Sequence, residues 1–422
     1  MDDTLKLDFL DGMQKSGIVP GLERIVPLLE RLGNPQDNFR SVLITGTNGK
    51  GSTAAFLESI LRSAGHRTGL FTSPHLVDVR ERIRVDGDVL TTDRFREIGL
   101  EVRRALETPG SGAPTTYFET LTALGFLAFA REGVEVAVVE VGMGGRFDST
   151  NALNPDVSVL TNVSLDHQRF LGDRVRDIAK EKIGVARQGR PFITGVDPEV
   201  FDAVVGPGLE RVRAPARRLG LDFQVTRVDG AIHWRGLRRV LDQAPLSLKG
   251  TFQADNAAMA LAAAEALEDL GLTVGEDAMR KGIRTTWWPG RFQVVGERPA
   301  MILDGCHNPG AADRLVETLD AYPQNRPLVL VHGSKPLKDY RAVLSRILSR
   351  VDHCIETSGE GLEDAGVLAE AARETAACEV ETMSDLDRAL STARERAGNG
   401  GTMLVTGSLH LVGAALRELR VL

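Results

Sequence analysis

The stretch Ser41-Val-Leu-Ile-Thr45-Gly46-Thr-Asn-Gly49-Lys50-Gly51-Ser52-Thr53 joins an apolar segment to a glycine-rich turn, and a helix-forming segment follows it as far as residue 64. In a strand, turn and helix of this kind, backbone N–H groups and the positive end of the helix gather around one point. Lys50 adds a full positive charge there. The pattern therefore predicts that the loop binds a phosphate group.

The spacing of this loop differs from the usual Gly-x-x-x-x-Gly-Lys-Ser/Thr pattern. Gly46 and Gly49 lie closer together than the two glycines of that pattern, and Gly51 separates Lys50 from Ser52. The alternative interpretation is an ordinary strand-to-helix turn with a lysine on the surface. The strand before the loop and the helix after it favour phosphate binding.

Apolar segments alternate with amphipathic ones on both sides of this loop. The pattern predicts strands at residues 41–45, 68–72, 134–141 and 157–163, and helices at 51–64, 118–131 and 175–187. A similar series begins after residue 300, with predicted strands at 301–304, 327–332, 354–357, 379–382 and 402–406. Such alternation is typical of mostly parallel sheets with helices on both faces.

The residues between the two series have a different character. Residues 214–249 are expected to form a peripheral β element, with a hairpin turn at Val228-Asp229-Gly230-Ala231, and a helix is predicted at 256–270. Residues 296–299 are interpreted as a linker. Because single cores stop growing at roughly 250–300 residues, two domains are expected. We predict an α/β protein with two doubly wound domains, an N-terminal P-loop-type ATPase domain at 1–296 and a smaller Rossmann-like domain at 297–422.

Composition excludes several classes of partner. The net charge of −7, with no basic run, argues against nucleic acid or an anionic membrane as the main partner. The three cysteines, Cys306, Cys354 and Cys378, contain no Cys-x-x-Cys pair, which favours a reducing compartment over disulfides or zinc. The sequence indicates neither a signal peptide nor a membrane span. We expect a cytoplasmic monomer that acts on small molecules.

Acidic and imidazole side chains follow two of the predicted strands. Glu140 ends one apolar segment, and Asp166-His167 follows the next. Strand ends of a doubly wound sheet collect near the loop after the first strand, where a carboxylate and an imidazole could hold Mg²⁺ against phosphate oxygens. For His167 the alternative is a hydrogen-bonded core or surface residue.

Motifs along nearly the whole chain occur in an order that resembles the folylpolyglutamate and dihydrofolate synthases of the Mur ligase superfamily. They are Thr45-Gly-Thr-Asn-Gly-Lys-Gly-Ser52, Thr72-Ser-Pro-His-Leu76, Glu140-Val-Gly-Met-Gly-Gly-Arg-Phe-Asp148, Leu165-Asp-His167, Glu181-Lys182-Ile-Gly184, Asn256-Ala-Ala, Pro289-Gly-Arg291, Asp304-Gly-Cys-His-Asn-Pro309 and Gly407-Ser-Leu-His. Two departures are Cys306, where an alanine is usual, and residues 333–339, which match the family's Asp-Lys-Asp loop only loosely. A small buried thiol is the expected state of Cys306.

The resemblance implies roles for the matched residues. Those implied to bind ATP are Asn48, Gly49, Lys50, Gly51, Ser52, Asn256, Arg291 and Asp304. Those implied to hold Mg²⁺ are Ser73, Glu140 and His167. Lys182 is implied to be a carbamate that helps to bind a second ion. In phosphate-binding loops the hydroxyl after the lysine usually contacts the metal, so Ser52 is a competing metal ligand. On local grounds alone, Lys182 would be a solvated helix lysine and Asp304 a turn residue.

The resemblance also implies two substrate sites. The pterin acid is expected in the N-terminal domain, at Pro20, Gly21, Leu22, Tyr117, Phe118, Glu119, Phe147, Asp148 and Ser149. L-Glutamate and part of the ATP site are assigned to the C-terminal domain, with His307 and Ser408 as the glutamate residues and His307 also as a catalytic residue beside Lys50 and Lys182. The local alternatives are a core position for Phe118 and a helix-start carboxylate for Glu119.

The implied reaction joins a carboxylic acid to L-glutamate with the hydrolysis of ATP. Phosphorylation would convert the acid, dihydropteroate or a reduced folate, to an acyl phosphate that the amine of glutamate attacks. ATP and Mg²⁺ are the expected cofactors. Two alternatives are another Mur-type amino-acid ligase and a nucleotide-responsive binding protein without turnover.

Overall fold

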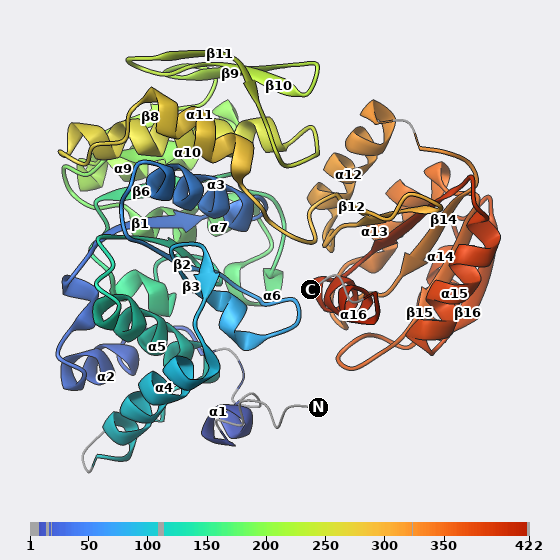
Figure 1. Ribbon diagram of the computed structural model, residues 1–422, viewed down its shortest axis with the longest axis horizontal. Helices are drawn as coiled ribbons and strands as arrows, with labels where there is room; N and C mark the ends of the chain where they lie inside the picture. The colour runs from blue at the N-terminus through green and yellow to red at the C-terminus, as the bar shows by residue number, and fades with distance from the viewer. Residues whose placement is uncertain (1–7, 14–16, 18, 109–113, 323, 420–422) are drawn as a thin grey trace. The chain divides into compact units, whose positions relative to one another are not determined.

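The computed structural model describes residues 8–13, 17, 19–108, 114–322 and 324–419 (Figure 1). The chain divides into two compact units. The first unit comprises residues up to 73, then 80–246 and 254–286, and the second comprises 74–79, 247–253 and the chain from residue 287 onward. Among the described helices, none combines the length and the apolar character that crossing a bilayer requires.

The first unit is built around an eight-stranded sheet, as far as the described residues extend, in the order β4-β3-β2-β5-β1-β6-β7-β8. Neighbouring strands run parallel, except that β3 is antiparallel to β2 and β4. The strands are β1 Arg40–Thr45, β2 Thr68–Phe71, β3 Ile83–Val85, β4 Asp88–Val89, β5 Val136–Glu140, β6 Val157–Leu160, β7 Phe192–Thr194 and β8 Ala216–Arg218.

Helices cover both faces of this sheet. Successive residues of a strand face opposite sides, and on β2 the Thr68 hydroxyl donates to Glu58 of α3 at 2.7 Å, whereas Gly69 lies directly against the Phe129 ring of α5. The helices of this unit are α1 Asp8–Met13, α2 Ile25–Arg31, α3 Lys50–Ser63, α4 Thr92–Glu107, α5 Tyr117–Arg131, α6 Gln168–Leu171, α7 Val175–Lys182, α8 Pro198–Val200, α9 Gly206–Val212, α10 Gln253–Asp269 and α11 Glu276–Thr285.

A separate antiparallel sheet confirms the predicted peripheral β element. Its strands are β9 Gln224–Val228, β10 Ala231–Arg235 and β11 Val240–Pro245. The turn between β9 and β10 has Asp229 at φ 49° and Gly230 at φ 80°, the two left-handed residues of a type I′ hairpin. Glu265 of α10 accepts hydrogen bonds from the backbone N–H groups of Leu237 and Arg238, at 2.9 and 3.3 Å. These bonds join the sheet to the helix.

The second unit has its own sheet, six-stranded over the described part of the chain, in the order β12-β13-β17-β14-β15-β16. It is parallel except for the β12–β13 pair. Its elements are β12 Gln293–Val295, β13 Ala300–Leu303, α12 Pro309–Ala321, β14 Leu328–His332, α13 Tyr340–Ile347, β15 His353–Thr357, α14 Ala365–Arg373, β16 Glu379–Met383, α15 Leu386–Ala397, β17 Thr402–Thr406 and α16 Leu409–Glu418.

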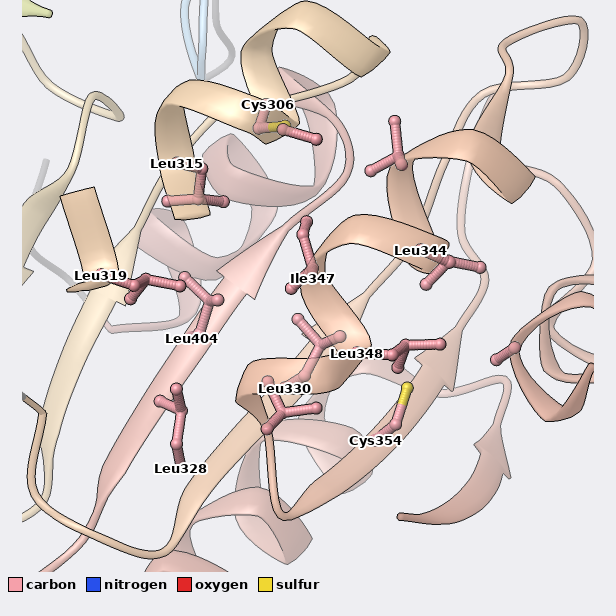
Figure 2. Close-up of a cluster of buried hydrophobic side chains, with 14 of the residues drawn as sticks. Cys306, Leu315, Leu319, Leu328, Leu330, Leu344, Ile347, Leu348, Cys354 and Leu404 are labelled. Carbon is pink, nitrogen blue, oxygen red and sulfur yellow. The ribbon is translucent and has the colours of Figure 1, made fainter. Parts of the chain in front are cut away.

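Each face of this second sheet has a separate apolar core. Leu328, Leu330, Cys354 and Leu404 lie on the face covered by α12 and α13, as Figure 2 shows. The residues that alternate with them, such as Val329 and Val405, pack with α15 and α16 on the other face. This arrangement confirms the predicted pair of doubly wound α/β domains, since strands buried on both sides form continuous apolar runs.

The predicted boundary at residue 297 requires correction. The second unit takes in the chain from Trp287, because Gln293–Val295 forms β12 and pairs with β13. Gly296, at φ 68°, lies in the turn between these strands and not in a linker. A strand of three residues is too short for its alternation to be recognised in the sequence.

Candidate active site

The loop between β1 and α3 has a backbone that only glycine accommodates at two positions. Gly46 and Gly49 adopt φ values of 150° and 85°. A Cβ atom at Gly46 would collide with the Thr161 hydroxyl, and one at Gly49 with the Asn256 side-chain oxygen. Asn256 also accepts a hydrogen bond from the hydroxyl of Thr53 at 3.5 Å. The structure thus brings Asn256 of α10 against the loop, as its implied role requires.

Residues after β6 fix the conformation of the loop. Asn162 accepts from the N–H of Asn48 at 3.0 Å and donates to the Asn48 carbonyl at 2.9 Å, while the Thr161 hydroxyl donates to the same carbonyl at 2.7 Å. Sequence reasoning missed both residues. Their signal is a pair of short polar side chains directly after a buried strand, at the sheet edge where the loop lies.

Two lysines converge on the same carbonyl of this loop. Lys50 donates to the carbonyls of Gly46 and Thr47, each at 3.1 Å, and Lys182 donates to Gly46 at 2.7 Å. Lys182 ends α7 and is buried. Burial, reinforced by the positive charge of Lys50, lowers the pKa of Lys182 to about 7. A substantial share of Lys182 is therefore a neutral amine near neutral pH.

The structure also brings together two of the residues implied to bind metal. Glu140 is buried at the end of β5 and accepts a hydrogen bond from the backbone N–H of Ser73 at 3.1 Å. His167 has a left-handed backbone, φ 51°, just before α6, and its side chain is 38% exposed with Nε2 3.9 Å from an Asp166 oxygen. This partial exposure of the side chain also fits the alternative that His167 is a surface residue.

The donor set of this region fits Mg²⁺ rather than a metal that requires a closed cage of side chains. Within the described residues, no group of three or more His, Cys, Asp and Glu side chains could hold a metal ion. Mg²⁺ retains several waters and is usually bound through one or two carboxylates together with substrate phosphates. Glu140, next to Ser73, supplies such a carboxylate, and Ser52 is buried in the first turn of α3.

Two of the three stretches assigned to the pterin acid lie side by side. The N–H of Gly21 donates to the carbonyl of Phe147 at 3.0 Å, which places the stretch from Pro20 to Leu22 against Phe147. The Phe147 side chain is 50% exposed. It therefore presents an aromatic surface that a flat ligand could stack on.

Asp148 and Ser149, which follow Phe147 in the segment after β5, are both buried. Asp148 accepts from Thr150, through N–H at 3.0 Å and the hydroxyl at 2.6 Å, and from the N–H of Met143 at 2.8 Å. Burial raises the pKa of Asp148 despite these bonds. The Ser149 hydroxyl is 3.0 Å from that of Thr122. These contacts give both side chains a structural task whether or not they also meet a ligand.

The stretch from Tyr117 to Glu119 begins α5. Glu119 completes a capping box with Thr116 and forms an ion pair with Arg24 at 2.9 Å, so both of its carboxylate oxygens are engaged. The Phe118 ring lies 6.1 Å from that of Phe71, a packing contact. The contacts observed are those of a packed aromatic residue for Phe118 and of a helix-start carboxylate for Glu119, the two alternatives stated from the sequence.

Arg82 is a further residue that sequence reasoning did not select. Its guanidinium lies 5.7 Å from the ring centroid of Tyr117, and its pKa is lowered by burial against the attraction of Tyr117 and Glu140. A half-buried cation that interacts with both a predicted metal ligand and a predicted pterin residue suits an anionic substrate group. In the sequence, Arg82 could be recognised only by its place in the segment that follows β2, eleven residues after Phe71.

In the second unit, Asp304 closes the turn after β13. It accepts from the N–H groups of Phe292 at 2.8 Å and Cys306 at 2.9 Å. Burial raises the pKa of Asp304, and the charge of Arg291 opposes that shift. The structure thus brings the two predicted nucleotide residues of this unit into electrostatic contact. The hydrogen bonds of Asp304 to backbone N–H groups are also those expected of a turn residue, the alternative stated for it.

The two residues assigned to glutamate lie on adjoining turns. His307 follows β13, with Nδ1 2.9 Å from the Gly305 carbonyl, and Ser408 follows β17 and caps α16 by accepting from the N–H of His410 at 3.1 Å. Gly407 donates to the Cys306 carbonyl at 3.0 Å, which joins the turns. Cys306 is buried, and burial raises its thiol pKa well above the usual value, as expected for an unreactive thiol.

Comparison with known families defines the class of protein. Residues 44–203 match the Mur ligase middle domain, and residues 290–409 match the glutamate ligase domain of Mur ligases. The chain is therefore a Mur ligase by class. The first match includes the glycine-rich loop and Lys182, and the second includes the turns of His307 and Ser408, whereas residues 20–22 and Asn256 lie outside both matched ranges.

Individual relatives narrow the class. A solved structure of E. coli FolC in complex with DHPP and ADP has a TM-score of 0.90 and 33% identity, over 98% of this chain and 97% of that chain. A bifunctional folylpolyglutamate synthase/dihydrofolate synthase with Mn, AMPPNP and L-glutamate bound has a TM-score of 0.87 and 31% identity, over 99% and 98%. The chain belongs to the folylpolyglutamate synthase/dihydrofolate synthase family, which confirms the resemblance seen in its motifs.

A third relative is longer than this chain. The probable bifunctional folylpolyglutamate synthase/dihydropteroate synthase of Haloferax volcanii is 36% identical over 97% of this chain, but only 49% of the relative is covered. The chain spans about half the length of that protein.

Proposed function

We propose that the chain is an ATP-dependent amide ligase that adds L-glutamate to dihydropteroate and to reduced folates. The observation that carries this proposal is the convergence of Lys50 and Lys182 on Gly46 in a loop whose backbone admits only glycine at two positions. A loop of this kind holds transferring phosphate. The relatives with ADP, AMPPNP and L-glutamate bound support the same substrates.

The chain's residues divide the reaction between the two units. Asn48, Gly49, Gly51 and Asn256 hold the phosphates of ATP, and Lys50 neutralises the group in transfer to the acid. Mg²⁺, held by Glu140, Ser73 and His167, supplies charge neutralisation when bound. Lys182 would add an anionic oxygen ligand as a carbamate, which forms when its neutral amine attacks CO₂ and releases a proton.

Residues of the second unit are assigned to the binding of the amine substrate and of part of ATP. Arg291 and Asp304 contact the nucleotide, while His307 and Ser408 bind glutamate, whose amine attacks the acyl phosphate. Phosphate then leaves and the amide remains. The substrates are small molecules, and we propose that the enzyme acts as a monomer in the cytoplasm.

Phosphate release with single omissions tests the proposal. Phosphate should form only when ATP, Mg²⁺, L-glutamate and a pterin acid are all present, and the product should be heavier than the acid by one glutamyl residue. ATP binding without phosphate release in the complete mixture would instead identify a nucleotide-responsive binding protein. Release that requires a different amino acid would indicate another Mur-type ligase.

A further inference from the structure

Three polar residues form a row across the apolar sheet of the second unit. Thr406, His332 and Glu356 occupy paired positions on β17, β14 and β15. They continue the alternation of Leu404, Leu330 and Cys354 and so face α12 and α13, the side drawn in Figure 2. The three side chains are 0% exposed.

The row contains one strong hydrogen bond and two unsatisfied atoms. His332 Nδ1 is 2.7 Å from an oxygen of Glu356, whose other oxygen accepts from the Cys354 thiol at 3.4 Å. His332 Nε2 and the Thr406 hydroxyl are buried without a hydrogen-bond partner. Apolar residues of similar volume would generally give equal or greater stability at such positions. Stability alone therefore does not account for the row.

The imidazole of His332 lies directly beneath the turn that carries Ser408. A Cβ atom on Gly407 would approach to 2.7 Å from His332 Nε2, and Gly407 has a φ of 112°, which favours glycine. Gly407 in turn donates to the carbonyl of Cys306 at 3.0 Å. The ring of His332 thus forms the surface against which Gly407 rests, and Gly407 connects the turns of His307 and Ser408.

We propose that His332 and Glu356 are a positioning pair that fixes the Gly407-Ser408 turn and thereby the affinity of the enzyme for glutamate. The inference rests on the proposed function, because it assumes that Ser408 binds glutamate. The bond to Glu356 fixes the rotation of the imidazole ring, whichever of the two groups carries the shared proton. A ring without that bond can rotate, and Gly407 and Ser408 move with it.

The test replaces each partner and separates the kinetic constants. His332→Phe preserves a flat ring but removes the bond to Glu356, and Glu356→Gln keeps the shape but changes the hydrogen bonding. Each should raise KM for glutamate roughly tenfold, a cost expected when a binding group is slightly misplaced, while KM for ATP changes less than about twofold. His353→Gln, at the opposite end of β15, is the matched control and should leave both constants unchanged.

A double variant distinguishes positioning from folding. His332→Phe combined with Glu356→Leu leaves no buried unpaired carboxylate, so its unfolding midpoint should recover relative to His332→Phe alone. The KM for glutamate should stay raised. A folded double variant with the wild-type KM for glutamate would overturn the positioning role, as would equal increases in KM for ATP and glutamate.

The proposed function can fail separately. If wild-type protein forms no glutamyl product with any pterin acid, the ligase assignment is wrong and the pair loses the role inferred for it. If wild type forms product and the variants match it in KM for glutamate, only the positioning role is wrong.

Discussion

Lys182 shows how burial changes the chemistry of a single side chain. Its amine lies 2.7 Å from the Gly46 carbonyl and close enough to Lys50 to be destabilised by that charge. By local pattern it would be a solvated helix lysine, whereas the structure buries it. The motif around it, and not its periodicity, predicted a special role, because sequence periodicity does not report the charge of a neighbour brought in from another element.

The lowered pKa of Lys182 predicts a pH-dependent stability for the metal-free protein. Between the folded pKa of about 7 and the ordinary lysine pKa of 10.5, the unfolded state binds more protons, so the free energy of unfolding rises with pH. The slope from this group approaches about 1.4 kcal/mol per pH unit. Urea unfolding at several pH values between these limits, in CO₂-free buffer, measures it.

Lys182→Met is the control for that measurement, because it fills the site without a titrating group. The difference in unfolding free energy between wild type and Lys182→Met should change with pH in this window and stay constant below it. A constant difference throughout would contradict the assigned pKa.

Lys50 should matter for catalysis far more than for folding. Lys50→Ala should lower kcat by roughly 10²–10³, the effect of removing one strong electrostatic stabiliser of a transition state. Lys180→Ala, on the exposed side of α7, is the matched control and should retain normal turnover. Steady-state phosphate release measures both, and near-normal turnover in a folded Lys50→Ala protein would refute the role of Lys50.

The carbamate proposed on Lys182 predicts a chemical rescue. Lys182→Ala should be inactive because the anionic oxygen ligand is missing, and an added small carboxylate such as acetate should restore part of the activity by occupying the vacated space. Lys182→Met fills that space and should not be rescued. Full activity of Lys182→Ala without acetate would exclude the carbamate.

At the scale of elements, local structure could be predicted wherever a short sequence pattern determines the backbone conformation. The Asp229-Gly230 turn and the strand before the glycine-rich loop follow from residue type and spacing. β12 was missed because three residues carry no recognisable period. The contacts of Glu119 with Arg24, and of His332 with Glu356, join residues far apart in sequence, and no local pattern reveals them.

The glycine-rich loop gives a prediction at this scale. Gly49→Ala should abolish most ATP binding, because a Cβ atom at this left-handed position would collide with Asn256. Gly65→Ala, at the other end of α3, has φ 93° and no atom within 4 Å of the added Cβ. Both variants should lose about 1–2 kcal/mol of stability from backbone strain.

Calorimetric titration with ATP separates the two effects. Only Gly49→Ala should lose affinity, whereas Gly65→Ala should bind as wild type does. Equal ATP affinity in both variants would show that the contact between Gly49 and Asn256 does not shape the nucleotide site.

At the scale of the molecule, the fold class followed from the alternation of apolar and amphipathic segments. The assignment of substrates did not, because it depended on a resemblance carried by ordered motifs. The structure adds a physical basis within each unit: the converging lysines in the first, and the joined turns of His307 and Ser408 in the second. Among the predicted pterin residues, Pro20 and Phe147 are exposed.

In the proposed reaction, this chain joins L-glutamate to a pterin acid and converts ATP to ADP and phosphate. The most direct test is glutamate incorporation by the wild-type protein with dihydropteroate and with tetrahydrofolate, followed by mass analysis of the products. We expect one added glutamyl residue on dihydropteroate and one or more on tetrahydrofolate, each dependent on ATP. If tetrahydrofolate but not dihydropteroate gives a glutamyl product, the bifunctional assignment is wrong. If neither acid gives a glutamyl product, the assignment as a ligase is wrong.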